Sequence, residues 1–312
     1  MATTTLIIST RNRPLLLRET LVSAINQSKP FDQIIISDNS FPPARHKDNV
    51  DALDDLLKQS SGKIKLLPTR CDLKSGEHTT FQQKHYIGGT DYCVLFHDDD
   101  LMEPNYHEEL LAIVENHAEV AAVACNARYL REGDLSRSTL MRTRKGTATV
   151  SGPQDLLSYY LDISPVGAPP LCSYLYRTSV LQELEFGRHL GGKYSDVSVL
   201  MQLAEHGLIR WICNPLVQYR VHAGQDSSEA STRDYRSLLN HLTANGSAVI
   251  SKRWLEMYRL KHFRLKLPSL ANKPTKARTY RRLLLLLSIG FTKKIVTKPD
   301  TFAYFWKRLI RT

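Results

Sequence analysis

Short apolar runs rich in β-branched residues alternate with helical segments along the first hundred residues, and this alternation limits the fold more than any other feature. The runs lie at residues 5–9, 33–37, 63–67 and 92–96. Between the first two, Pro14 begins a segment in which Leu17, Leu21 and Ala24 recur at helical spacing. Strands that alternate with helices form βαβ units, and runs that are apolar at successive positions are buried on both faces. We therefore expect an α/β fold with a mainly parallel central sheet and flanking helices.

The second half of the chain continues this pattern less regularly. Further strands are expected at 120–124, 172–176, 210–213 and 216–221, and helices from Pro104 and over 197–204, where Gly207 ends the second. Weak alternation over 128–150 indicates a hairpin. From residue 231 onward the pattern is helical, with breaks at three prolines. The sequence thus predicts one large domain over 1–230 and a helical C-terminal region over 231–312.

The net charge of +11 is concentrated near the C-terminus. Residues 252–312 contain seventeen Lys and Arg and two acidic residues, a balance of +15, and the other 251 residues hold 25 bases and 29 acids, a balance of −4. Aromatic residues, among them Phe305 and Trp306, are interleaved with these bases. Basic amphipathic helices with aromatic residues lie in the plane of anionic membranes, so we expect this region to bind a membrane surface. Packing on the large domain or on a partner subunit is the alternative, and no nucleic-acid recognition motif accompanies the bases.

The five cysteines are scattered singly, so their spacing predicts neither a disulfide framework nor a zinc site. Three of them fall in apolar stretches expected to be strands, and buried reduced thiols are typical of a reducing compartment. The first residues lack the basic and apolar regions of a secretory signal, and no apolar run reaches the ~18 residues that a spanning helix needs. We expect a cytoplasmic protein.

Polar residues follow three of the expected strands at the point where each strand ends. They are residues 9–13 (Ser-Thr-Arg-Asn-Arg), 37–40 (Ser-Asp-Asn-Ser) and 97–100 (His-Asp-Asp-Asp). Ligands of open parallel sheets bind beyond the carboxyl ends of the strands. Three adjacent carboxylates raise one another's pKa, a cost that a divalent cation removes, and hard oxygen ligands suit Mg²⁺ or Mn²⁺. A solvated Asp-rich turn is the alternative, but the polar ends of the neighbouring strands favour a site.

These segments resemble glycosyltransferase family 2, with its GT-A fold. The resemblance rests on Ile-Ser-Thr-Arg-Asn-Arg-Pro at 8–14, Ile-Ile-Ile-Ser-Asp-Asn-Ser at 34–40 and Leu-Phe-His-Asp-Asp-Asp at 95–100, and extends over roughly residues 4–228 in order and spacing. It implies a Rossmann-like GT-A catalytic domain over 1–230, with a nucleotide-sugar half at about 1–100 and an acceptor half at about 101–230. Family members often carry Asp where His97 stands, which leaves open which two of Asp98, Asp99 and Asp100 hold the metal.

The resemblance also implies roles for individual side chains. In the family, the loop after the first strand and the Asp of the second hold the nucleoside, and the acidic motif carries the metal and diphosphate. The implied nucleotide-binding residues are Thr10, Arg11, Arg13, Asp38, Lys84, Asp98 and Asp99. The implied ligands of Mn²⁺ or Mg²⁺ are Asp98, Asp100 and His222. Weaker candidates beside the diphosphate or the acceptor are Arg220, His78 and Gln83.

Two later segments extend the resemblance. Tyr194-Ser195-Asp196, at the start of an expected helix, resembles the family's acidic pair with Ser in place of the first acid, so Asp196 is the implied general base. A carboxylate near a helix N-terminus is stabilised as the anion, and a capping role is compatible with catalysis. Residues 219–222 (Tyr-Arg-Val-His) resemble the family's Tyr-Arg-x-His loop, although a purely structural His222 is the alternative.

The implied function is inverting, metal-dependent transfer of a sugar. The implied donor is a nucleoside-diphosphate sugar, and UDP is the family's commonest nucleotide. The implied acceptor is a hydroxyl of a glycan or of a lipid-linked acceptor. The reaction would belong to cell-envelope polysaccharide synthesis, such as that of lipopolysaccharide O-antigen. The enzyme would be peripheral on the inner face of the cell membrane, and oligomerisation is left open. One alternative is a nucleotidyltransferase acting on a sugar phosphate. Such an enzyme would need a Gly-rich phosphate-binding loop after the first strand. The other is a non-catalytic nucleotide-sugar-binding subunit, which Ser195 favours but the intact Asp98-Asp99-Asp100 run opposes.

Overall fold

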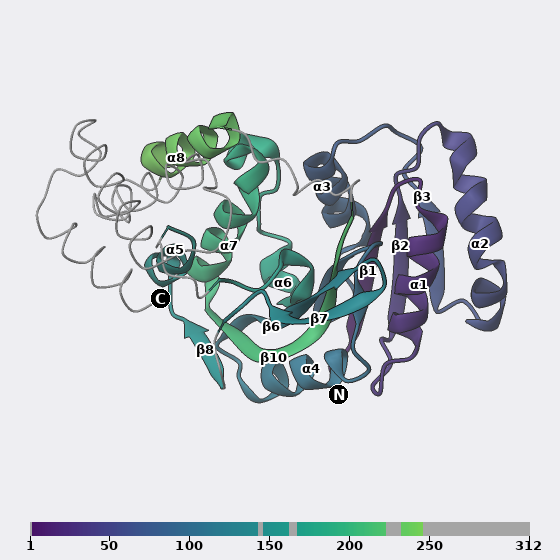
Figure 1. The fold of residues 1–312 in the computed structure, drawn as a ribbon, viewed down its shortest axis with the longest axis horizontal. Helices are drawn as coiled ribbons and strands as arrows, with labels where there is room; N and C mark the ends of the chain where they lie inside the picture. Colours follow the sequence, from purple (N-terminus) through teal and green to yellow (C-terminus); the bar gives the residue numbers. More distant parts are fainter. Residues whose placement is uncertain (1, 143–145, 162–166, 223–231, 246–312) are drawn as a thin grey trace, which may run out of the picture.

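The computed structural model describes residues 2–142, 146–161, 167–222 and 232–245 (Figure 1). Its strands are β1 Thr4–Thr10, β2 Gln33–Asp38, β3 Ile64–Pro68, β4 Tyr92–His97, β5 Leu101–Met102, β6 Val120–Arg131, β7 Asp134–Thr139, β8 Thr147–Val150, β9 Tyr174–Arg177 and β10 Leu208–Val221. Its α-helices are α1 Pro14–Ile25, α2 His46–Gln59, α3 Ser75–Tyr86, α4 Tyr106–Asn116, α5 Pro153–Leu161, α6 Thr178–Leu181, α7 Ser195–His206 and α8 Thr232–Asn245. Within these ranges, no helix is both long and apolar enough to cross a membrane.

One sheet organises the molecule, with strand order β3-β2-β1-β4-β9-β6-β10-β5, and β7 and β8 pair with β6 and β10 at its margins. Strand β1 runs parallel to β2 and β4, and β2 runs parallel to β3, which confirms the predicted βαβ units. The register sets Thr10 opposite Asp38 and Ser9 opposite His97. The polar strand ends therefore meet at one edge, as predicted.

The second half of the sheet is mixed. Strands β6 and β10 are parallel, whereas β9 lies between β4 and β6 and is antiparallel to both. The expectation of two short strands at 210–213 and 216–221 is wrong, because β10 is one continuous strand. Its pairing with β6 shifts register around Pro215, so the strand bends there instead of ending. The predicted hairpin is confirmed as β6–β7.

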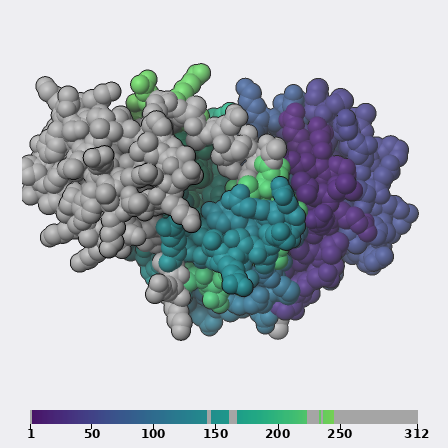
Figure 2. Space-filling model, viewed as in Figure 1, coloured from purple at the N-terminus to yellow at the C-terminus, as the bar shows by residue number. Residues whose placement is uncertain are grey.

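Alternate residues of the strands feed two cores on opposite faces of the sheet. Leu6 and Ile8 of β1 pack with α1, α2 and α4, while Ile7 packs on the other face with α5, α6 and α7. Each of these three side chains is fully buried. In Figure 2 the N-terminal quarter and the middle of the chain form one continuous surface. Burial on both faces explains why these strands are apolar at successive positions.

The helical pattern predicted from residue 231 is confirmed for α8. Leu238 and Leu242 of α8 pack against Leu157 of α5 and Val197 of α7 in a small third core. The basic, aromatic-rich segment over 252–312, which carries the membrane prediction, lies outside the described residues.

Candidate active site

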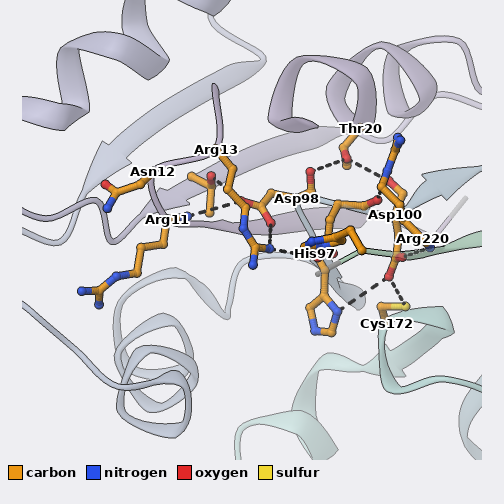
Figure 3. Close-up of polar contacts among 12 residues, drawn as sticks. Arg11, Asn12, Arg13, Thr20, His97, Asp98, Asp100, Cys172 and Arg220 are labelled. Carbon is orange, nitrogen blue, oxygen red and sulfur yellow. Dashed lines mark hydrogen bonds and ion pairs between the residues drawn. The ribbon is translucent and has the colours of Figure 1, made fainter. Parts of the chain in front are cut away.

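The acidic loop after β4 is fixed by its backbone as well as by its side chains. The Thr20 hydroxyl of α1 lies 2.9 Å from the carbonyl oxygen of Asp98 and 2.8 Å from that of Asp100 (Figure 3). Thr20 is fully buried, and each of the three aspartates is less than one-tenth exposed. The loop is therefore held against α1 before any ligand binds.

Asp98 holds the loop that follows β1 in place. Its Oδ2 accepts hydrogen bonds from the Thr10 hydroxyl at 2.7 Å and from the Arg11 backbone N–H at 3.3 Å, and its Oδ1 accepts one from Arg13 Nη1 at 3.1 Å. Burial raises the pKa of Asp98, against the opposing effects of Thr10 and Arg13. With both oxygens engaged, Asp98 ties the ends of β1 and β4 together.

Asp99 joins the loop after β1 to the end of β10. Its Oδ2 lies 2.9 Å from Arg13 Nη1 and 2.9 Å from His222 Nε2, and its carbonyl oxygen accepts a 2.8 Å bond from Arg220 Nε. Burial acts to raise the pKa of Asp99, but the neighbouring His97, His222 and Arg13 together hold it below its ordinary value. This carboxylate is therefore ionised and lies between the Arg13 guanidinium and the His222 ring.

Asp100 is turned into the protein. Its Oδ1 accepts the Arg220 backbone N–H at 2.9 Å, and its Oδ2 accepts a hydrogen bond from the Cys172 thiol at 3.1 Å and lies 3.7 Å from His97 Nδ1. The Arg220 side chain continues outward to Glu19, with Nη2 2.5 Å from Oε2. Arg220 thus joins the end of β10 to the acidic loop and to α1.

A hollow of about 630 Å³ opens at the ends of β2 and β3. It is lined by Asp38, Ser40, Pro43, His46, Pro68 and Arg70. The Asp38 carboxylate accepts the Ser40 N–H at 2.9 Å and lies 2.6 Å from His46 Nδ1. Sequence reasoning found Asp38 but not His46 or Arg70. Arg70 could have been found because it follows a predicted strand at the same edge, whereas His46 becomes a neighbour of Asp38 only through the turn into α2.

The candidates on α3 have different surroundings. His78 is buried with Nε2 2.8 Å from the Ser37 hydroxyl, and burial lowers its pKa to about 4, so the ring is neutral at pH 7. The Gln83 amide donates to the carbonyl oxygens of Leu181 and Leu184 at 2.8 and 2.6 Å. Lys84 is exposed. His78 and Gln83 thus hold α3 against its neighbours, and Lys84 is the most exposed member of this group.

Arg11 contacts the loop after β3. Its Nη2 lies 2.7 Å from Asp72, and its Nη1 donates to the Leu73 carbonyl at 3.1 Å. Both side chains of the ion pair are about half exposed. Arg11 therefore joins the loops that follow β1 and β3.

Asp196 lies in the first turn of α7, as predicted. Its Oδ1 is buried and has no hydrogen-bond partner among the described residues. Burial raises the pKa of Asp196 to about 6, with smaller opposing effects from the backbone N–H groups of Val197 and Asp196. Its charge also raises the pKa of Tyr174, after the larger effect of burial. Tyr174, the first residue of β9, follows Cys172 by two residues, and Cys172 contacts Asp100. The segment that leads into β9 therefore passes from the surroundings of Asp100 to those of Asp196.

Asp99 and His222 offer a divalent cation a carboxylate oxygen and an imidazole nitrogen that lie 2.9 Å apart. Their side chains are 10% and 25% exposed, and a carboxylate oxygen with an imidazole nitrogen suits Mn²⁺, or Mg²⁺ through the carboxylate, when phosphates and water complete the shell. The prediction of Asp98, Asp100 and His222 as metal ligands stays a prediction, and the contacts of the described residues place Asp99 beside His222. Asp98 is used by the β1 loop, and Asp100 faces Cys172 and the backbone of β10. Asp99 and His222 therefore fit a cation in this arrangement of side chains.

A family model described as "Glycosyltransferase like family 2" matches residues 2–237. The chain belongs to glycosyltransferase family 2. It is accordingly a glycosyltransferase of the class that uses nucleotide sugars. No curated protein sequence matches the chain.

Solved structures of low sequence identity share the fold of this family 2 glycosyltransferase. S. aureus TarS 1-349 has a TM-score of 0.59 at 14% identity, covering 91% of this chain and 81% of that one. The same fragment in complex with UDP-GlcNAc has a TM-score of 0.57 at 14% identity, covering 86% and 76%. GalNAc-T7 with UDP, GalNAc and Mn²⁺ has a TM-score of 0.55 at 11% identity, covering 90% of this chain and 54% of that one. The predicted GT-A fold is confirmed.

Proposed function

We propose that this glycosyltransferase inverts the anomeric centre while it moves a sugar from a UDP-linked donor to an acceptor hydroxyl. The observation that carries the proposal is the cluster at the sheet edge, where Arg13, Asp99, Arg220 and His222 lie in contact beside the hollow at Asp38. Cations and an ionised carboxylate in one place suit a diphosphate held with a metal ion. The solved relatives with UDP-GlcNAc and with UDP and Mn²⁺ support the same donor class.

The nucleoside is proposed to bind in the hollow at the ends of β2 and β3. Asp38 would accept hydrogen bonds from it, with Thr10, Arg11 and Arg13 on the β1 side. The exposed Lys84 on α3 is a further candidate for phosphate contact. The diphosphate would then extend from Asp38 toward Asp98 and Asp99.

The metal is proposed to be Mn²⁺ or Mg²⁺, held by Asp99 and His222. When bound, it acts as a Lewis acid that stabilises negative charge on the departing nucleoside diphosphate. Arg13 and Arg220 would contribute positive charge beside it, because each already contacts Asp99. Thr20 and Thr10 keep the acidic loop in one place, so little is reorganised as the donor binds.

Asp196 is proposed as the general base. It would take the proton from the acceptor hydroxyl, whose oxygen attacks the anomeric carbon as the bond to the diphosphate breaks. A pKa of about 6 leaves the carboxylate ionised at pH 7 and makes it a stronger base than an ordinary aspartate. Its buried Oδ1 has no hydrogen-bond partner among the described residues, so it would be free to accept a hydrogen bond from the acceptor hydroxyl once that hydroxyl reaches it. Ser195, where the family's first acid is expected, leaves this task to Asp196 alone.

The acceptor side is proposed to lie in the half of the catalytic domain over about 101–230. A glycan or lipid-linked acceptor of the cell envelope would bind there. The basic region over 231–312 would bring the enzyme to the inner face of the membrane. This part of the proposal rests on the charge and aromatic content of the C-terminal region.

Product analysis with the full chain tests the proposal. Nucleotide sugars would be screened with and without Mn²⁺ by thermal shift, and those that bind would be incubated with polyprenyl-linked and free glycans. Release of nucleoside diphosphate with a glycosylated product supports the proposal. Release of pyrophosphate would instead identify a nucleotidyltransferase. Donor binding without any product across the acceptor panel would indicate a binding subunit.

A further inference from the structure

Three side chains of different chemistry converge where β4 and β9 meet. They are His97 at the end of β4, Asp100 in the acidic loop and Cys172 before β9 (Figure 3). Cys172 Sγ lies 3.1 Å from Asp100 Oδ2, and His97 Nδ1 lies 3.7 Å from the same oxygen. The three donor atoms all lie within 4.8 Å of one another. A thiol, an imidazole and a carboxylate are thus gathered around one point.

These separations suit one tetrahedral metal ion. With Zn–S near 2.3 Å and Zn–N and Zn–O bonds near 2.1 Å, tetrahedral angles put the ligand atoms about 3.4 to 3.6 Å from one another. The two distances at Asp100 fall on either side of that range. The donor atoms of Cys172 and His97 are also within 4.8 Å of each other, so side-chain movements on the order of 1 Å bring all three atoms to one ion.

The donor set also distinguishes this point from the Asp99–His222 pair. Thiolate and imidazole are preferred ligands of Zn²⁺, whereas Mg²⁺ and Mn²⁺ prefer oxygen. The other oxygen of Asp100 is taken by the Arg220 backbone N–H, which fixes Oδ2 toward Cys172. Cys172 and Asp100 are buried, and the His97 side chain is 51% exposed. An ion would enter from the His97 side.

We propose that His97, Asp100 and Cys172 form a Zn²⁺ site, separate from the proposed diphosphate metal, with a fourth position open to water. On binding, the Cys172 thiol releases its proton to solvent and forms a Zn–S bond, with no change of oxidation state. The ion would join the acidic loop to β9. The cysteine spacing predicted no zinc site because these ligands come from distant segments and only one of them is a cysteine.

Cobalt substitution in the full chain tests the site. Metal-free, reduced protein would be titrated with Co²⁺, and thiolate-to-cobalt charge transfer in the near ultraviolet would be followed. One equivalent should develop the band, and one equivalent of Zn²⁺ should remove it, while excess Mn²⁺ should not. No band at one equivalent overturns the proposal.

Variants identify the ligands. Cys172→Ser should abolish the band, and the matched control Cys93→Ser, a buried cysteine on β4, should keep it. His97→Ala, at a half-exposed position where folding is not at risk, should weaken Zn²⁺ binding by about 100-fold or more, since changes even to residues that only support metal ligands cost 10–100-fold. A band that persists in Cys172→Ser, or Zn²⁺ affinity unchanged in His97→Ala, overturns the proposal.

Discussion

Replacing Asp196 by Asn should slow transfer and stabilise the protein in the same variant. The carboxyl has an ordinary pKa of 3.8 and a folded-state pKa of about 6, a difference of about 2 units, and each unit corresponds to about 1.4 kcal/mol. Because the folded pKa is raised, ionisation costs stability as the pH rises from about 4 through 6. Integrating proton linkage between pH 4 and pH 8 gives a cost of about 2 kcal/mol.

Urea unfolding of both proteins at a series of pH values measures this cost. The free energy of unfolding of Asp196→Asn minus that of wild type should grow by about 2 kcal/mol between pH 4 and pH 8. In transfer assays the variant should lose about 10²–10⁴-fold in kcat while its affinity for UDP stays unchanged. Wild-type kcat/KM should fall below about pH 6, as the base becomes protonated.

The matched control is Asp134→Asn, at an exposed position on β7. It should leave transfer near the wild-type rate. The reasoning about Asp196 would be refuted by a stability difference that does not grow with pH. Full turnover in Asp196→Asn would refute its assignment as the base, even if the stability result held.

Three further variants test other parts of the structure. His46→Ala should raise the Kd for UDP about 5-fold, measured by calorimetry, because it removes one partner of Asp38 worth about 1 kcal/mol, and an unchanged Kd would contradict its place in the nucleoside site. His222→Ala should raise the Mn²⁺ concentration for half-maximal transfer at least about 10-fold, and equal Mn²⁺ dependence would exclude it as a ligand. Leu17→Ala, fully buried on α1, should lower the free energy of unfolding by about 2–5 kcal/mol in urea titrations, whereas Leu15→Ala, 75% exposed on the same helix, should cost less than about 0.5 kcal/mol.

The first four large strands could be predicted because their signal is local. β1, β2 and β4 each contain an apolar run ended by a polar residue, and burial on both faces follows from that pattern. β3 departs from it, because Lys65 is exposed and Leu66 and Leu67 are only partly buried. The place of β9 between β4 and β6 could not be predicted, because pairing between distant segments depends on the packing of the whole sheet. Pro215 was also misleading. It breaks the local pattern, but a register shift against β6 accommodates it.

The members of the site were easier to predict than their partners. Polar residues at the ends of parallel strands converge because of topology, so Thr10, Asp38 and the acidic run could be found from the sequence. The direction of each side chain in the run could not. Successive aspartates in a tight loop point different ways, and contacts from β1, β9 and β10 decide which of them faces His222.

The continuous strand β10 limits how this protein can vary in length. Arg220 and His222 stand at alternate positions, so both are presented on the same face as the acidic loop. A deletion or insertion of one residue between Val217 and Tyr219 would move both side chains to the opposite face while leaving the composition almost unchanged. Surface loops such as the β6–β7 turn can gain or lose residues with little effect, but the residue count of this strand is set by the contacts that Arg220 and His222 make with the acidic loop.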